Sequence, residues 1–395
     1  MRQNGVMYKK GALPAVALLL CALLVGCVTD VDSDQPFGSA GDGTLGEVLE
    51  SFRSQNGLPA LAGMIVHQGR VVEMAAVGVR RAGFPDAIRV TDLWHLESIT
   101  KSMTSTLVAR LVEQGIVSWG TTVSQALPDL AERIRPEYAD VTMEELLTHT
   151  SGMPNDLGAS PIVSTHSRPD DLAAVVVERH ELAAQLLELL PVGARGDFLY
   201  ANNGYVVAGA MLEALTGEAW ETLMRRELFQ PLGITSGGFG PPGDPERPDQ
   251  PWGHYLSRPT WIPEWSDNAS AIGPAGTVHI SMEDMAKYMA AHLAGARGEA
   301  GGILEPESFE RLHTPPPQSK PCRDSNCLFE NYAKGWGVAQ GGAVLTHNGS
   351  NGLWLAWVWL SPEKDVGVFV VSNAGQGFEG TNGARSALLN RINSL

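Results

Sequence analysis

Residues 94–115, WHLESITKSMTSTLVARLVEQG, combine an apolar stripe with two polar groups at a spacing that suits catalysis. Apolar side chains recur at every fourth position, which is the repeat of one helix face, and Gly115 would cap the helix end. Ser98 and Lys101 are three residues apart, so they share a face near the start of this helix. The apolar stripe consists of Ile99, Met103, Leu107 and Leu111.

The pairing of Ser98 with Lys101 matches the S-x-x-K pattern of a serine nucleophile that a lysine activates. The positive end of the helix dipole would also stabilise an oxyanion at this point. One S-x-x-K is weak evidence, because Ser361 and Lys364 form a second copy. In that copy Pro362 prevents a helical turn, so we interpret it as a hairpin loop between two strands.

Two further motifs follow Ser98 in chain order. Y-x-N occurs once, at Tyr200-Ala201-Asn202, on a loop that leads into a predicted helix. The segment from His347 to Ser350, H-N-G-S, lies between two strand-like runs, whereas the similar H-x-G at His67 reads as a plain hairpin turn. The three motifs in this order are far more specific than any one of them. Their key residues are Ser98, Lys101, Tyr200, Asn202, His347, Gly349 and Ser350.

Length and charge narrow the class of protein. The chain has 395 residues, of which 44% are hydrophobic, enough for one large domain or two. Acidic residues outnumber basic ones by 44 to 28, and the formal net charge is −16. A surface of this charge repels phosphate backbones, so we expect no nucleic-acid partner.

Residues 1–26 have the pattern of a signal peptide rather than of a folded segment. Their start is basic, and residues 12–26 are apolar but short for a membrane-spanning helix. The sequence LVGC at 24–27 resembles the lipobox of bacterial lipoproteins, which implies cleavage before Cys27 and a lipid on its sulfur. Ordinary signal cleavage and an uncleaved anchor are the alternatives. Residues 27–43 read as a flexible tether, so we expect a lipid-anchored protein on the extracytoplasmic face of the cell envelope.

The other cysteines support export. Cys21 would leave with the signal peptide and Cys27 would carry the lipid, so Cys322 and Cys327 remain. These two flank a short polar loop, CRDSNC, and in an oxidising compartment we expect them to form a disulfide. A reduced pair on the surface is the alternative. No His or further Cys stands nearby at ligand spacing, so we predict no metal site.

Strand-like runs at both ends of the chain bracket a helical middle. Residues 60–67 and 70–78 form the first two runs, and the segment 337–372 contains four more. The economical architecture is α/β (α+β), with one antiparallel sheet built from both termini and flanked by helices. We expect a single domain over residues 44–392, in which about 115–276 form a mostly helical lobe beside a cleft.

The ordered motifs and several longer segments resemble the serine β-lactamase and penicillin-binding-protein superfamily. The resemblance lies on the side of class C β-lactamases, DD-peptidases and esterases, and it covers about residues 44–392. The segments that carry it are LLTHTSGMP (146–154), YANNGYVVAGAMLEALTG (200–217), PLGI (231–234), AGTVHISMEDMAKYM (275–289) and THNGSNG (346–352).

The resemblance implies an acyl-enzyme mechanism that needs no metal or organic cofactor. Ser98 would be the nucleophile, and Lys101 would lower the cost of deprotonating it. Tyr200 would act as general base in acylation and as general acid toward the leaving group. A phenol with a pKa of about 10 is a poor base, so it would need Lys101 and a desolvated cleft. Asn202 would bind the acyl amide or steer Lys101.

The H-N-G-S segment would complete the site. The resemblance implies an oxyanion hole from the backbone N–H groups of Ser98 and Ser350, with Gly349 allowing close approach. His347 stands where class C β-lactamases carry Lys, and a neutral His would bind a carboxylate less strongly, which favours a peptidase, amidase or esterase. A purely structural role is the alternative for His347. Glu97 stands where the family usually has Gly, and we interpret it as tolerated or as an unwelcome charge.

We therefore expect a serine hydrolase of the cell envelope that cleaves an amide or ester. Its substrate would be a small molecule or peptide, such as a D-amino-acid peptide or a small ester. A true class C-like β-lactamase is the first alternative, and a non-catalytic scaffold with the same fold is the second. His149 in the LLTHTSGMP segment is expected to be structural, fixing a loop near the cleft.

Overall fold

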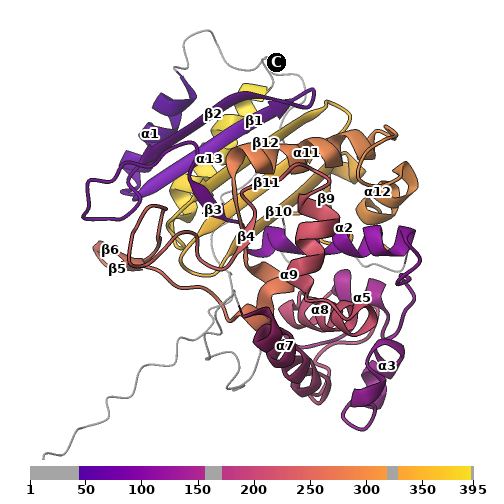
Figure 1. Cartoon of the computed structure of the whole chain (residues 1–395). Helices are drawn as coiled ribbons and strands as arrows, with labels where there is room; N and C mark the ends of the chain where they lie inside the picture. The colour runs from indigo at the N-terminus through magenta and orange to yellow at the C-terminus, as the bar shows by residue number, and fades with distance from the viewer. Residues whose placement is uncertain (1–43, 156–170, 318–327, 393–395) are drawn as a thin grey trace, which may run out of the picture.

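The computed structural model confirms the expected α/β architecture of an antiparallel sheet with flanking helices (Figure 1). The predicted signal segment and tether, including Cys27, lie outside the described residues, and so do Cys322 and Cys327. Within the described part of the chain, no helix is both long and apolar enough to cross a membrane. The described residues are 44–155, 171–317 and 328–392.

Seven antiparallel strands form the central sheet. They are β1 (Ala60–His67), β2 (Arg70–Gly78), β8 (Asn331–Tyr332), β9 (Gly337–Ala339), β10 (Val344–Ser350), β11 (Leu355–Ser361) and β12 (Val366–Ser372). Their order is β2-β1-β12-β11-β10-β9-β8. β1 pairs with β12, with Leu61 opposite Ser372, so the sheet joins the two ends of the chain as predicted. The second S-x-x-K begins at Ser361, the last residue of β11, and continues through the predicted turn to β12.

Helices cover both faces of this sheet. They are α1 (Leu45–Gln55) and α13 (Phe378–Arg391) on one face and α11 (Met282–Ala296) on the other. Leu61 and Ile65 of β1 pack with α1 and α13, whereas Met64 belongs to the larger core that includes residues of α11. Successive side chains of a strand point to opposite faces, so one apolar run serves two cores.

Helices also dominate the middle of the chain, in and around the predicted lobe. They are η1 (Glu97–Ile99), α2 (Thr100–Glu113), α3 (Val123–Ala126), η2 (Pro128–Leu130), α4 (Pro136–Ala139), α5 (Met143–Leu147), α7 (Leu172–Leu187), α8 (Asn202–Thr216), α9 (Trp220–Leu223), η3 (Met224–Phe229), η4 (Ser270–Ile272), α10 (Gly273–Gly276), α12 (Pro306–His313) and η5 (Gln340–Gly342). α2 and α8 are buried along most of their length and pack against each other.

One buried ion-pair cluster holds this lobe together. The guanidinium of Arg179 in α7 pairs with Glu213 of α8 and, at 2.5 Å, with Glu221 of α9. It also donates hydrogen bonds to the carbonyl oxygens of Ala271, at 3.1 Å, and Ser270, at 3.0 Å. Three helices and the segment that leads to α10 therefore meet at one fully buried side chain.

Two small sheets occur where the sequence predicted helices and loops. One consists of β3 (Leu93–His95), β4 (Gly238–Phe239) and β7 (Val278–Ser281), and the other is the hairpin of β5 (Gly253–Ser257) and β6 (Thr260–Glu264). The Pro, Gly and Trp content of residues 241–263 predicts a loop rather than strands. A tertiary contact fixes the hairpin instead: His254 Nε2 accepts a 2.9 Å hydrogen bond from the backbone of Ala82.

Candidate active site

Ser98 is the one residue from Trp94 to Ala109 that is not buried. It lies in η1, which runs directly into α2. The residues of the predicted apolar stripe are all 0% exposed, so the core anchors the helix on which Ser98 sits. These buried residues are Ile99, Met103, Leu107 and Leu111.

Lys101 lies next to Ser98, as the helical spacing predicted. Its Nζ is 2.8 Å from Ser98 Oγ and donates a 2.6 Å hydrogen bond to the carbonyl oxygen of Ala275. The side chain is 0% exposed, and this burial lowers the pKa of Lys101 well below its usual value, against the opposing charge of Glu97. A neutral amine held in this way can direct its lone pair at the Ser98 hydroxyl.

Tyr200 is the third member of this cluster. Its phenol shares a hydrogen bond with Ser98, and Lys101 Nζ lies 5.0 Å from the centre of its ring. Burial raises the pKa of Tyr200 and outweighs the hydrogen bond from Ser98. The sequence-based expectation that a desolvated cleft favours the phenolate is wrong, because burial disfavours the charged form.

His149 positions Tyr200. Its carbonyl oxygen accepts a 2.8 Å hydrogen bond from the backbone of Leu199, and its Nδ1 accepts one of 3.1 Å from Ala201. The ring centroids of His149 and Tyr200 are 4.3 Å apart. His149 has a φ of 57°, a conformation that is uncommon outside glycine and that lets one residue hold both flanks of Tyr200. This geometry agrees with the structural role expected for His149.

Asn202 begins α8, one turn from the cluster. Its backbone N–H donates a 2.8 Å hydrogen bond to Asn155 Oδ1, and its side chain is partly exposed. Among the described residues, no hydrogen bond joins this side chain to Lys101, so the structure does not support direct steering of the lysine. Contact with a substrate amide is the role that stays open to Asn202.

Gly349 brings β10 against the nucleophile. A Cβ atom at this position would lie 2.4 Å from the backbone nitrogen of Ser98 and 2.5 Å from Glu97 Cβ, so glycine is needed for this close approach. The Ser350 hydroxyl donates a 3.3 Å hydrogen bond to the carbonyl oxygen of Gly375 and accepts one of 3.1 Å from Gly352. These bonds hold the end of β10 beside η1, which it contacts.

His347 lies in β10 with both ring nitrogens engaged. Nε2 is 2.8 Å from the hydroxyl of Tyr332, and Nδ1 is 2.7 Å from the carbonyl oxygen of Asn348. Burial and the charge of Lys101 lower the pKa of His347 to about 3. The ring is therefore neutral, with Tyr332 donating to Nε2 and Nδ1–H donating to the carbonyl. In this state His347 has no N–H left for a substrate carboxylate.

An aromatic cluster borders Tyr200. Tyr332 lies 6.4 Å from Tyr200 between ring centroids, and Phe198 and Phe329 lie 5.6 and 5.4 Å from Tyr332. Phe198 and Phe329 are partly exposed, so they offer an apolar surface next to the reactive groups. We did not predict this cluster, because its residues come from separate segments and form no spaced motif.

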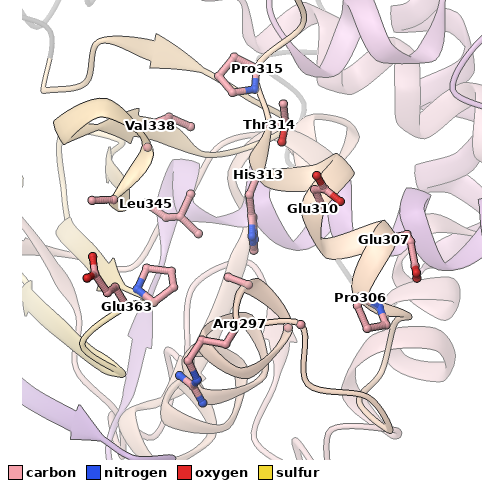
Figure 2. A pocket seen from close by; sticks show the side chains of 16 residues that line it. Arg297, Pro306, Glu307, Glu310, His313, Thr314, Pro315, Val338, Leu345 and Glu363 are labelled. Atoms are coloured by element: carbon pink, nitrogen blue, oxygen red, sulfur yellow. The ribbon is translucent and has the colours of Figure 1, made fainter.

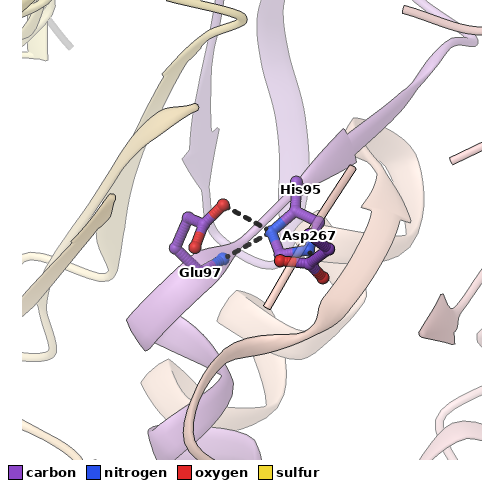
Figure 3. Close-up of side chains that lie close together, drawn as sticks. All are labelled: His95, Glu97 and Asp267. Carbon is purple, nitrogen blue, oxygen red and sulfur yellow. Dashed lines mark hydrogen bonds and ion pairs between the residues drawn. The ribbon is translucent and has the colours of Figure 1, made fainter. Parts of the chain in front are cut away.

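Sequence reasoning also missed a charged cluster beside Ser98 (Figure 3). His95 lies between Glu97, whose Oε1 is 2.8 Å from Nδ1, and Asp267, whose Oδ2 is 2.6 Å from Nε2. The three side chains are at most 2% exposed. The H-x-E pattern before Ser98 was the available signal. A metal ion fits poorly here, because the two carboxylates lie at opposite ring nitrogens and one ion cannot replace both contacts.

A cavity of 790 Å³ lies apart from these groups, between the end of α11, α12 and the turns that follow β9 and β11 (Figure 2). Neither Ser98, Lys101 nor Tyr200 lines it. Arg297, which does, is already paired with Glu299 at 2.6 Å and with Asp365. We place the candidate active site at Ser98 because reactive groups converge there, whereas the cavity has no comparable arrangement.

Comparisons with known proteins agree with this fold. The Beta-lactamase family model matches residues 45–390. Penicillin-binding protein 4 of Amycolatopsis lactamdurans is 26% identical over 336 residues, which cover 83% of this chain and 84% of that protein. The octameric penicillin-binding protein homologue from Pyrococcus abyssi superposes with a TM-score of 0.69 at 24% identity, covering 88% of this chain and 76% of its own. The D-amino acid amidase from Ochrobactrum anthropi SV3 superposes with a TM-score of 0.69 at 19% identity, over 88% of this chain and 98% of the amidase chain. The chain therefore belongs to the β-lactamase family.

Proposed function

We propose that this protein is a serine hydrolase that forms an acyl-enzyme on Ser98 and cleaves uncharged esters or amides. One observation carries the proposal: Lys101 Nζ is 2.8 Å from Ser98 Oγ, in surroundings that favour the neutral amine. A buried amine with a lowered pKa is the kind of base that activates a serine.

The electrostatics favour Lys101 over Tyr200 as the base in acylation. Ser98 Oγ bonds to the substrate carbonyl carbon while its proton moves to Lys101 Nζ. The backbone N–H groups of Ser98 and Ser350 stabilise the resulting oxyanion. Tyr200, whose raised pKa keeps it protonated, donates its proton to the departing oxygen or nitrogen and regains one from Lys101. Water then attacks the acyl-enzyme by the same steps in reverse.

The state of His347 supports an uncharged substrate. A DD-peptidase substrate and a β-lactam carry a carboxylate near the reacting carbonyl, and a neutral ring with both nitrogens engaged attracts it weakly. The partly exposed rings of Phe198 and Phe329 suit an aromatic or aliphatic group instead. The D-amino acid amidase has been solved with L-phenylalanine amide, an aromatic amide that has no carboxylate. Asn202, whose side chain is partly exposed, would bind the acyl amide.

Matched substrates test this proposal on the full chain. We expect an acylated D-alanyl-D-alanine methyl ester or amide to be hydrolysed faster than the free acid. Ser98→Ala should be inactive on all of them, because the attacking oxygen is lost. Ser361→Ala, at the second S-x-x-K, is the matched control and should retain full activity.

Intact-mass spectrometry with benzylpenicillin separates the alternatives. Released penicilloate without a lasting adduct, together with preference for the free acid, would identify a β-lactamase or carboxypeptidase instead. A wild-type protein that turns over none of the substrates and is not acylated would be a non-catalytic member of the family. Turnover by Ser98→Ala equal to that of wild type would refute the assignment of the nucleophile.

A further inference from the structure

Glu97 occupies a backbone conformation that an L-residue adopts at a cost. Its φ is 53°, in the left-handed region, where a residue with a Cβ atom is strained. Glycine at this position would avoid that strain. A strained, buried glutamate next to the proposed nucleophile therefore points to a use for its side chain.

His95 holds the Glu97 side chain and is itself held by Asp267. His95 in β3 bridges Glu97 and Asp267, and Asp267 Oδ1 accepts a 3.0 Å hydrogen bond from the side chain of Asn351. Asn351 directly follows Ser350 at the end of β10. The cluster thus connects η1, β3, the segment around Asp267 and the end of the strand that lies beside Ser98.

The cluster carries negative charge next to the site. Burial lowers the pKa of His95, but the carboxylates of Asp267 and Glu97 outweigh it and raise the value to about 10. Burial raises the pKa of Glu97 to about 7, against the opposing effect of His95. His279 of β7, which also faces the cluster, is neutral because burial lowers its pKa to about 4. One imidazolium between two carboxylates leaves a net negative charge when Glu97 is ionised.

Glu97 lies in η1, four residues before Lys101 in α2, and the other ionisable groups beside the lysine are neutral. Burial lowers the pKa of His149 well below its usual value and that of His347 to about 3. Burial likewise raises the pKa values of Tyr200 and Tyr205, whose rings lie 5.0 and 5.6 Å from Lys101 Nζ. Glu97 is the acidic group whose charge favours the protonated lysine and opposes the effect of burial.

We infer that Glu97, held by His95, which Asp267 holds in turn, is a positioning residue that tunes Lys101 as the base acting on Ser98. The inference rests on the proposed function, because it concerns how Ser98 is activated. Without the glutamate charge, Lys101 would be neutral at lower pH but would also be a weaker base. The glutamate therefore places the working range of the site at higher pH.

The test follows the rate at which a fluorophosphonate labels Ser98 across pH, measured by intact mass on the full chain. In this reaction Ser98 Oγ bonds to phosphorus, fluoride leaves and the serine proton passes to Lys101. We expect Glu97→Gln to move the acidic limb of the profile to lower pH. A shift of one pH unit makes the variant about tenfold faster below the limb, while its weaker base makes it slower at high pH. The two profiles should cross.

Two further variants separate charge from structure. Glu97→Gly removes the same charge and relieves the positive φ, so it should move the limb in the same direction even if Glu97→Gln folds poorly. Glu73→Gln is the matched control, because Glu73 pairs with Arg391 on the other side of β1 and its loss should leave the profile unchanged.

The outcomes are distinguishable. A uniform fall in rate at every pH, or a limb that stays in place in both Glu97 variants, would overturn the inference and leave the proposed function standing. Absence of labelling in the wild type would refute both.

Discussion

Gly349→Ala tests whether the approach of β10 sets the position of Ser98. The added methyl group would lie 2.4 Å from the Ser98 nitrogen and 2.8 Å from the carbonyl oxygen of Leu96, which are backbone atoms that cannot rotate away. The first of these contacts is about 1 Å short of van der Waals distance, so β10 or η1 must move by that amount. Overpacking of this kind costs about 1–3 kcal/mol of stability, and a 1 Å misplacement of a reacting group costs about 100-fold in rate.

The assay compares the labelling rate of Ser98 by a fluorophosphonate with the thermal midpoint of the same protein. Gly367→Ala is the control, because its methyl group would meet the tips of Met289 and Leu360, at 2.7 and 2.8 Å, in the same sheet. We expect both variants to melt earlier and only Gly349→Ala to lose about 100-fold in labelling. If Ser98 in the Gly349→Ala variant is labelled at the wild-type rate, β10 does not determine the position of the nucleophile and the reasoning fails.

Two predictions concern the rest of the chain. Arg179→Met leaves Glu213 and Glu221 buried without their cation, and we expect it to lower the free energy of unfolding by about 3–5 kcal/mol at pH 8. The pKa of Glu213 is already raised to about 7, so the folded state takes up a proton between that value and the unfolded pKa of 4.5. The loss in free energy of unfolding, measured by urea titration, should therefore be smaller at pH 5.5 than at pH 8. An equal loss at both pH values would contradict this prediction. Cys27→Ser should abolish incorporation of labelled palmitate and retention in the membrane pellet, and unchanged incorporation would refute the predicted lipid anchor.

Much of the fold could be predicted because its signals are local. A Thr44 and Glu47 capping box starts α1, and β1, β2 and β12 follow apolar runs between turn residues. The hairpin β5–β6 could not be predicted, because its strands show no clear alternation and a distant contact through His254 fixes it. Short strands such as β3 and β4 were missed for the same reason, since their pairing partner β7 is remote in sequence.

The candidate site was predictable in its members but not in their charge states. The spacing of Ser98 and Lys101 fixes their contact, since residues three apart on a helix are neighbours. The neutral state of His347 depends on its burial and on the charge of Lys101, and the hydroxyl that contacts Nε2 belongs to Tyr332, fifteen residues away in the chain. The sequence allowed either a substrate-binding or a structural role for His347, and no spacing rule distinguishes them.

By itself, the sequence determined the long strands at both ends of the chain and the helix that carries Ser98, because each follows from a local pattern of polarity. The close approach at Gly349 was implied by the resemblance to a known family. Only the tertiary structure decided which ionisable groups share a low-dielectric interior. Burial and groups that are close in space set the protonation of Lys101, Tyr200 and Glu97. The reason is that the charged form is stabilised or destabilised by the groups packed around it, which the order of residues in the chain does not reveal.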